Sequence, residues 1–109
     1  MARPVNQSNG RNWRTQTAAK AHFKEMLNRH HDGQRVLGLA DHSDLLALVQ
    51  RYDRGEPVSS QKAGVGIDQF FRDRDQEHDG LTSCFFVRRV DGSKIDFSVY
   101  RAVEVASTP

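Results

Sequence analysis

The sequence has 109 residues, of which 37% are apolar and 28% charged, and its formal net charge is +2. This length allows one small domain, and no apolar run approaches the roughly 18 residues of a membrane-spanning helix, so we expect neither a second domain nor membrane contact. The single cysteine, Cys84, excludes an internal disulfide framework.

The apolar residues divide the chain into a polar N-terminal arm and a compact domain. Among residues 1–22 only Val5 is a Val, Ile, Leu or Phe, whereas such residues recur from Phe23 onwards. We therefore expect a flexible arm over residues 1–11, a folded domain over 12–105 and a flexible tail over 106–109. The first residues lack the apolar segment of a secretory signal, which favours a reducing, cytoplasmic setting.

The first predicted elements are a short strand over residues 12–15, which brings Trp13 against the domain, and a helix over about residues 17–30. The helix is predicted because its apolar side chains have the spacing of one buried stripe. That stripe consists of Ala19, Phe23, Met26, Leu27 and His30. Either Thr15 or Thr17 can supply the oxygen that caps the first turn.

A second helix is expected after a turn and a short apolar segment at residues 36–39, which we expect to dock on the core. Asp41 or Ser43 can cap this helix, and its leucines and valine within residues 45–52 form the buried side. The composition of residues 53–64 then predicts a loop.

The C-terminal half changes to the period of β-strands, with strands expected near residues 65–71, 83–90 and 93–101. Asp91-Gly92 between the last two runs predicts a hairpin with a two-residue type I′ turn, which needs positive φ at both positions. The predicted fold is therefore one α+β domain, with two helices packed on an antiparallel sheet of three to four strands.

A two-residue turn fixes which side chains share a face of the hairpin. It places Phe86 opposite Phe97 and Arg89 opposite Lys94. We expect the more apolar face, which also carries Cys84, to pack on the helices. The other face is mixed, with aromatic and basic side chains: Phe85, Val87, Tyr100, Arg89 and Lys94.

The sequence predicts no metal, no cofactor and no catalytic residue. Acids alternate over residues 72–80 before Gly80, as in a calcium loop, but Phe86 stands where the bidentate glutamate belongs when the count starts at Asp75. The five histidines lack the spacing of metal ligands. No P-loop, G-x-S-x-G, H-E-x-x-H or C-x-x-C motif is present, so enzymatic activity is not indicated.

Charge and aromatic placement favour an anionic partner. Residues 1–40 contain seven Lys or Arg against two acids. The candidate nucleic-acid contacts in this part are Arg11, Trp13, Arg14, Lys20 and Lys24, because an aromatic ring between cations suits base stacking with phosphate neutralisation. Trp13 has an alternative role in closing the core. The mixed hairpin face adds Arg89 and Lys94 as a second candidate surface.

Several segments of the chain resemble the small DCL-like domain of unknown function. They are Ala19-x-x-x-Phe23-x-x-x-Leu27, Asp44-Leu45-Leu46-x-Leu48-Val49, Gly64-Val-Gly66-Ile67, Cys84-Phe-Phe-Val-Arg-Arg-Val-Asp-Gly92 and Asp96-Phe97-Ser98. The domain is named from the plant "defective chloroplasts and leaves" protein and also occurs at the C-terminus of the largest subunits of plant-specific RNA polymerases.

The resemblance implies a role near RNA, since the plant members are linked to plastid ribosomal RNA maturation, and it carries over no catalytic residue. We therefore expect a monomeric, non-enzymatic binding or accessory domain whose partner is RNA or a ribonucleoprotein. A protein–protein adaptor and an enzyme of unrecognised type are the alternatives. A continuous basic surface favours the first interpretation, an exposed apolar patch the second, and a deep pocket with convergent polar groups the third.

Overall fold

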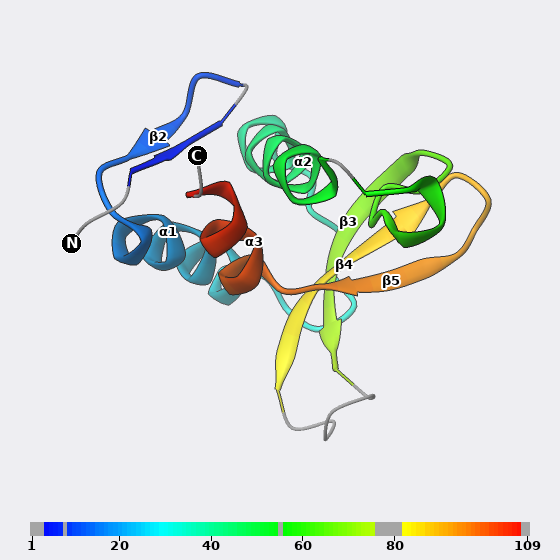
Figure 1. Cartoon of the computed structure of the whole chain (residues 1–109). Coiled ribbons are helices and arrows are strands. Elements are labelled where there is room, and N and C mark those ends of the chain that lie inside the picture. The colour runs from blue at the N-terminus through cyan, green and yellow to red at the C-terminus, as the bar shows by residue number, and fades with distance from the viewer. Residues whose placement is uncertain (1–3, 8, 55, 76–81, 108–109) are drawn as a thin grey trace.

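The computed structural model describes residues 4–7, 9–54, 56–75 and 82–107. Three helices pack on one face of a three-stranded antiparallel sheet of order β3-β4-β5, and a separate two-stranded sheet joins β1 to β2 (Figure 1). The strands are β1 (Val5–Asn6), β2 (Asn12–Trp13), β3 (Ile67–Arg74), β4 (Ser83–Arg89) and β5 (Lys94–Phe97). The helices are α1 (Gln16–Asn28), α2 (Leu39–Asp53) and α3 (Val99–Ala106), and Val58–Ser60 form one 3-10 turn. The predicted α+β class is confirmed.

Helix α1 forms as its sequence predicts. The Thr15 hydroxyl accepts a hydrogen bond from the Ala18 amide at 3.1 Å, which identifies Thr15 as the N-cap. Ala19, Phe23 and Met26 are fully buried, so the predicted stripe faces the core.

Helix α2 begins at Leu39, earlier than the predicted caps Asp41 and Ser43, and Gly38 precedes it without a side-chain cap. The two polar side chains bind elsewhere: Asp41 forms an ion pair with Arg29, and the Ser43 hydroxyl accepts a hydrogen bond from Asn9. Asp41 and Ser43 therefore bind residues distant in the sequence and do not cap α2. The expected docking of residues 36–39 holds for Val36 alone, since Leu37 and Leu39 are 73% and 88% exposed.

The β4–β5 hairpin has a three-residue loop in place of the predicted two-residue turn. Gly92 has φ +88°, but no described non-glycine residue, Asp91 included, has positive φ, so the type I′ turn does not form. The Gly92 amide donates to the Arg89 carbonyl at 3.0 Å, and the Arg89 amide donates to Ser93 at 2.8 Å. This is the arrangement of a tight turn followed by a left-handed glycine.

The longer loop shifts the pairing by one residue and inverts the faces of β4. Phe97 lies opposite Phe85, and Lys94 lies opposite Arg88. The predicted partners Phe86 and Arg89 are therefore wrong. Phe85, Val87 and Phe97 are fully buried, whereas Cys84 and Phe86 point to the opposite face and are only partly buried.

The last predicted strand ends early and a third helix replaces its second half. β5 stops at Phe97, and the Ser98 hydroxyl accepts a hydrogen bond from the Arg101 amide at 3.4 Å, capping α3. The β-branched residues of this segment suggested a strand over 93–101. The apolar residues after Phe97 nevertheless repeat with helical spacing on the buried side of α3: Val99, Ala102, Val103 and Ala106.

The folded domain also includes part of the expected arm. Val5 is fully buried in the core cluster and pairs with Trp13 across the β1–β2 ladder. A further segment extends the main sheet beyond β3, where Arg35 forms an isolated antiparallel bridge with Phe71. The Val36 amide donates to the Phe70 carbonyl at 2.9 Å. A short fourth chain segment therefore lies at this edge of the sheet.

Candidate functional site

The sheet has an outer face, on the side opposite the three helices, that carries aromatic and basic residues. Directly paired residues point to the same side of a sheet, so the register defines two rows across this face. The first row contains Arg35, Phe71, Phe86 and Asp96. The second row contains Gln69, Arg88 and Lys94.

Two stacked rings lie at the centre of the outer face. The Phe71 and Phe86 ring centroids are 5.4 Å apart with an interplanar angle of 21°. Phe71 is only 6% exposed, whereas Phe86 retains partial exposure. The Arg88 guanidinium lies 5.6 Å from the Phe71 centroid, and the Lys94 ammonium lies 5.9 Å from the Phe86 centroid. Phe86 is therefore the ring on which another planar group can stack.

Three exposed cations surround these rings: Arg35, Arg88 and Lys94. Within the described part of the chain none of them forms an ion pair, in contrast to Arg29 with Asp41 at 3.1 Å. Among the described residues no carboxylate therefore pairs directly with these three cations, which are the groups of the outer face that can attract an anion.

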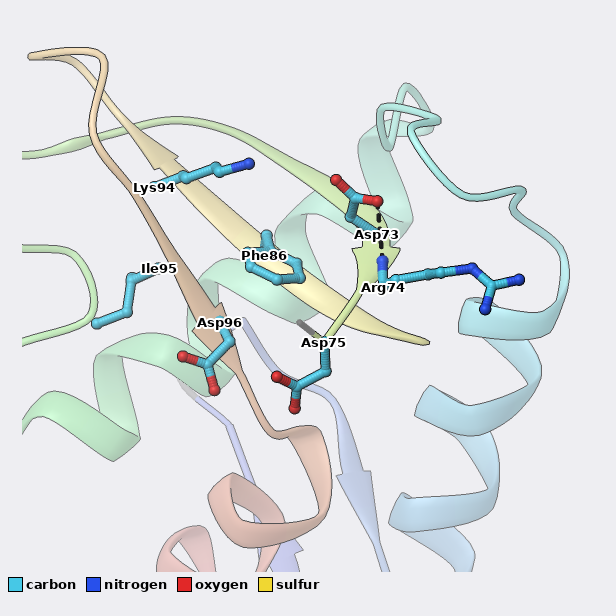
Figure 2. A pocket seen from close by; sticks show the side chains of 7 residues that line it. All are labelled: Asp73, Arg74, Asp75, Phe86, Lys94, Ile95 and Asp96. Carbon is cyan, nitrogen blue, oxygen red and sulfur yellow. Dashed lines mark hydrogen bonds between the residues drawn. The ribbon is translucent and has the colours of Figure 1, made fainter. Parts of the chain in front are cut away.

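A hollow of about 240 Å³ lies over Phe86. Its lining consists of Asp73, Arg74, Asp75, Phe86, Lys94, Ile95 and Asp96 (Figure 2). The Arg74 side chain is bound by Asp32 at 3.4 Å. The Ser83 hydroxyl, followed by Arg72 and Arg74, holds the pKa of Asp32 below its usual value. The charge of Arg74 is therefore partly neutralised. Lys94, the other cation that lines the hollow, has no ion pair among the described residues.

A second hollow of about 470 Å³ adjoins the first, because Asp75 and Asp96 line both. It continues past Cys84 to Tyr100 at the start of α3. Burial, followed by the charges of Asp75 and Asp96, raises the pKa of the Cys84 thiol to about 11. The thiol is therefore neutral near pH 7 and lacks the low pKa of a catalytic cysteine.

We predict that Cys84 reacts slowly with iodoacetamide. Its raised pKa reduces the thiolate fraction at pH 8, and the partial compensation by nucleophilicity leaves the rate at least roughly tenfold below that of an unfolded control. The rate should rise with pH until the pH passes about 11. Mass spectrometry of native and urea-unfolded protein over pH 7–11 measures this, and equal rates would contradict the prediction.

The N-terminal candidate residues are spread over paired and unpaired positions. Arg11 lies 3.5 Å from Asp44 and its guanidinium lies 5.6 Å from the Trp13 centroid. Lys20 forms an ion pair with Glu104 at 2.9 Å. Arg14 and Lys24 are exposed. The structure brings Arg11 and Trp13 together, and places them away from the outer face.

Trp13 has aromatic neighbours within the domain. Its ring centroid lies 5.1 Å from that of His22 and 5.6 Å from that of Phe23. With Arg11 also near the ring, the partly buried Trp13 packs against the core cluster, as the alternative role in closing the core requires.

Arg89 has a structural role on the side of the sheet opposite Lys94. Its guanidinium donates to the carbonyls of Gln61 at 2.9 Å and Lys62 at 3.1 Å. It passes so close to Gly64 that a Cβ there would lie 2.8 Å from Arg89 Nε. Gly64 has φ +53°, so a side chain would strain the backbone as well. The predicted pairing of Arg89 with Lys94 is wrong, since Arg88 is the arginine opposite Lys94.

A buried carboxylate ties the N-terminal segment to the helices. Asp44 is 4% exposed, and its Oδ2 lies 2.9 Å from His22 Nε2. Its Oδ1 accepts a hydrogen bond from Asn9 Nδ2 at 3.0 Å. Asn9 also donates to the Ser43 hydroxyl. Among the described residues no hydrogen bond joins His22 to Ser43.

We predict that Asp44→Ala lowers the free energy of unfolding by about 2–3 kcal/mol, because the hydrogen bonds that this buried, charged carboxylate forms with His22 and Asn9 are lost. Asp41→Ala is the matched control in the same helix. It removes a more exposed ion pair and should cost about 1 kcal/mol or less. Urea denaturation of both variants checks the difference, and equal losses would show that Asp44 contributes no more than a surface pair.

No group of three or more His, Cys, Asp or Glu residues that could hold a metal occurs among the described residues. The calcium-loop pattern includes residues 76–81, which lie outside the described part of the chain. No helix in the part described has both the length and the apolar character needed to cross a bilayer.

The fold and this face define a small α+β domain with an aromatic–basic sheet surface. Residues 24–103 match the model of the family described as "Protein of unknown function (DUF3223)", and the chain belongs to this family. It is also similar to the solution NMR structure of an uncharacterised protein from Rhodospirillum rubrum, with 29% identity and a TM-score of 0.74. That similarity covers 94% of this chain and 89% of the other. No curated protein matches the chain.

Proposed function

We propose that this domain binds single-stranded RNA on the outer face of β3–β5. The observation that carries the proposal is the ring of Phe86, partly exposed in a hollow and flanked by cations that have no ion pair among the described residues. Base stacking on an aromatic ring together with phosphate neutralisation is the usual chemistry of single-strand recognition.

Each part of the outer face has a role in this proposal. A base enters the hollow and stacks on Phe86, while Arg35 in the same row and Arg88 in the neighbouring row bind the backbone phosphates. Lys94 is exposed, and its flexible side chain can move from the ring to the rim when a base enters. A base in a duplex cannot reach the hollow without leaving its stack, so the proposal specifies single strands.

RNA rather than DNA is favoured by the resemblance to the DCL-like domain, whose plant members are linked to ribosomal RNA maturation. A cytoplasmic setting and a monomeric state belong to the same proposal. Cys84 is a free thiol, which suits a reducing compartment.

An NMR titration of the protein with short RNA and DNA oligonucleotides at two salt concentrations tests the proposal. We expect amide shifts concentrated on β3, β4 and β5 that grow with RNA concentration and shrink at the higher salt. Phe86→Ala should abolish most of the shift while keeping a folded spectrum. The absence of RNA-dependent shifts at low salt would overturn the proposal.

A protein partner is the second candidate, because Leu37 and Leu39, on either side of the N-cap Gly38 of α2, are 73% and 88% exposed. Exposed apolar side chains of this size are typical of association surfaces. No shift at all when RNA is added would overturn RNA binding and leave the adaptor function as the remaining candidate.

A further inference from the structure

The hollow over Phe86 is chemically asymmetric. Lys94 and Asp96 lie on different sides of the ring, both on β5 (Figure 2). Asp96 lies directly opposite Phe86 in the β4–β5 register, and Lys94 lies opposite Arg88, two residues further along β4. A planar group stacked on Phe86 therefore meets a carboxylate at one edge and an ammonium group at another.

Asp96 is the carboxylate of this hollow that has both oxygens without a hydrogen bond or ion pair among the described residues. Asp73 accepts a hydrogen bond from the Arg74 amide at 2.8 Å (Figure 2), and Asp75 is engaged in other interactions. Within the described residues no hydrogen bond or ion pair involves the Asp96 side chain. An ionised carboxylate has two oxygens that can accept from two adjacent donors.

We propose that this hollow binds a guanine base, an inference that rests on the proposed RNA binding and specifies its ligand. Guanine has two adjacent donors, N1–H and the N2 amino group, which fit the two oxygens of Asp96. On its other edge it has the acceptors O6 and N7, which fit the ammonium of Lys94.

The other bases match this arrangement less well. Adenine and cytosine each have one amino group beside an unprotonated ring nitrogen, which a carboxylate repels. Uracil has one N–H between two carbonyl oxygens. Guanine is therefore the base whose donors and acceptors agree with both charged residues, and the volume of about 240 Å³ admits a single base with its solvent.

Fluorescence anisotropy with labelled hexanucleotides tests this inference. The oligonucleotides are oligo-uridine with guanosine, adenosine, cytidine or inosine at the third position. Because a good bidentate contact favours the correct base strongly, we expect the guanosine hexamer to bind about tenfold or more tighter than the adenosine hexamer. Inosine, which lacks the N2 amino group, should bind with intermediate affinity.

Asp96→Asn should reduce the guanosine preference to within about threefold, because the amide has one acceptor oxygen in place of two. Asp68→Asn is the matched control, since it removes the same charge from an exposed position of β3 that does not line the hollow. A melting curve of each variant verifies its fold. If Asp96→Asn does not fold, the inosine comparison on the natural chain still decides the inference.

The outcomes separate the two proposals. Equal binding of all hexamers by the natural chain, or a guanosine preference that survives in Asp96→Asn, would overturn the guanine site and leave RNA binding intact. No binding of any hexamer would overturn the proposed function, and the guanine site with it.

Discussion

Replacing Phe97 by alanine should lower the free energy of unfolding by about 3–4 kcal/mol, the range expected for removing a buried phenyl ring. Phe97 is fully buried at the end of β5, opposite Phe85. Its ring also lies edge-on to Tyr52, with centroids 6.0 Å apart. The variant leaves a cavity between sheet and helices, where the surrounding side chains relax only partly. Urea denaturation measures the loss.

Two adjacent phenylalanines provide the matched comparison for this experiment. Phe85→Ala should cost as much as Phe97→Ala, because both rings are fully buried on the core side. Phe86→Ala removes a partly exposed ring stacked on Phe71 and should cost no more than about 1.5 kcal/mol. A large loss for Phe86→Ala with a small loss for Phe85→Ala would mean that the hairpin has the register with a two-residue turn.

The elements whose signals are local could be predicted from the sequence. α1 has a capping threonine and an apolar stripe in one short segment, so its position and buried side follow from those residues alone. The start of α2 could not be found in the same way. Asp41 and Ser43 are good caps locally, but Arg29 and Asn9 bind them instead, and both partners are distant in the sequence.

The hairpin register depends on a small difference in backbone conformation. Asp91-Gly92 correctly indicates a turn, yet Gly92 alone has positive φ, and one additional loop residue inverts the faces of β4. The strand predicted to continue through Val99 to residue 101 fails for a related reason. Val99 suits a strand as well as a helix, and the capping contact of Ser98 together with the buried stripe Val99, Ala102, Val103 and Ala106 favours the helix α3.

The type of candidate surface could be predicted from the sequence, but only some of the residues on it could. The sequence indicated a sheet face with aromatic and basic residues and named Lys94, which lies there. The one-residue shift replaces Phe85 and Arg89 by their neighbours Phe86 and Arg88. Arg35 could not be found, because its position on this face depends on the bridge between a loop segment and β3.

The largest effect on binding is expected from the phosphate contacts of the outer face. When binding releases counterions, log Kd rises linearly with the logarithm of the salt concentration. Each phosphate contact adds roughly 0.7 to the slope for a single strand. Arg35→Gln with Arg88→Gln should therefore lower the slope by about 1.4 and weaken binding at low salt. Both side chains are exposed, so the melting temperature should change little.

The control variant removes the same charge elsewhere. Arg54 and Arg101 are exposed and belong to neither hollow. Arg54→Gln with Arg101→Gln lowers the net charge by two as well, so it reproduces any general electrostatic effect. A slope within about 0.3 of the natural chain would assign the loss in the first variant to contacts on the outer face. An equal loss in both variants would show that only the overall charge matters.

A third variant distinguishes the outer face from the N-terminal surface, whose cations are the competing candidates for RNA binding. If they bind the RNA, replacing Arg11, Arg14, Lys20 and Lys24 by Gln should lower the slope by up to about 2.8. Since the proposed site lies on the outer face, and Arg11 and Lys20 already have the carboxylate partners Asp44 and Glu104, we expect a smaller decrease than the outer-face pair produces. The opposite ranking, measured by anisotropy between 50 and 200 mM salt, would move the RNA site to the N-terminal surface and contradict the role proposed for Phe86.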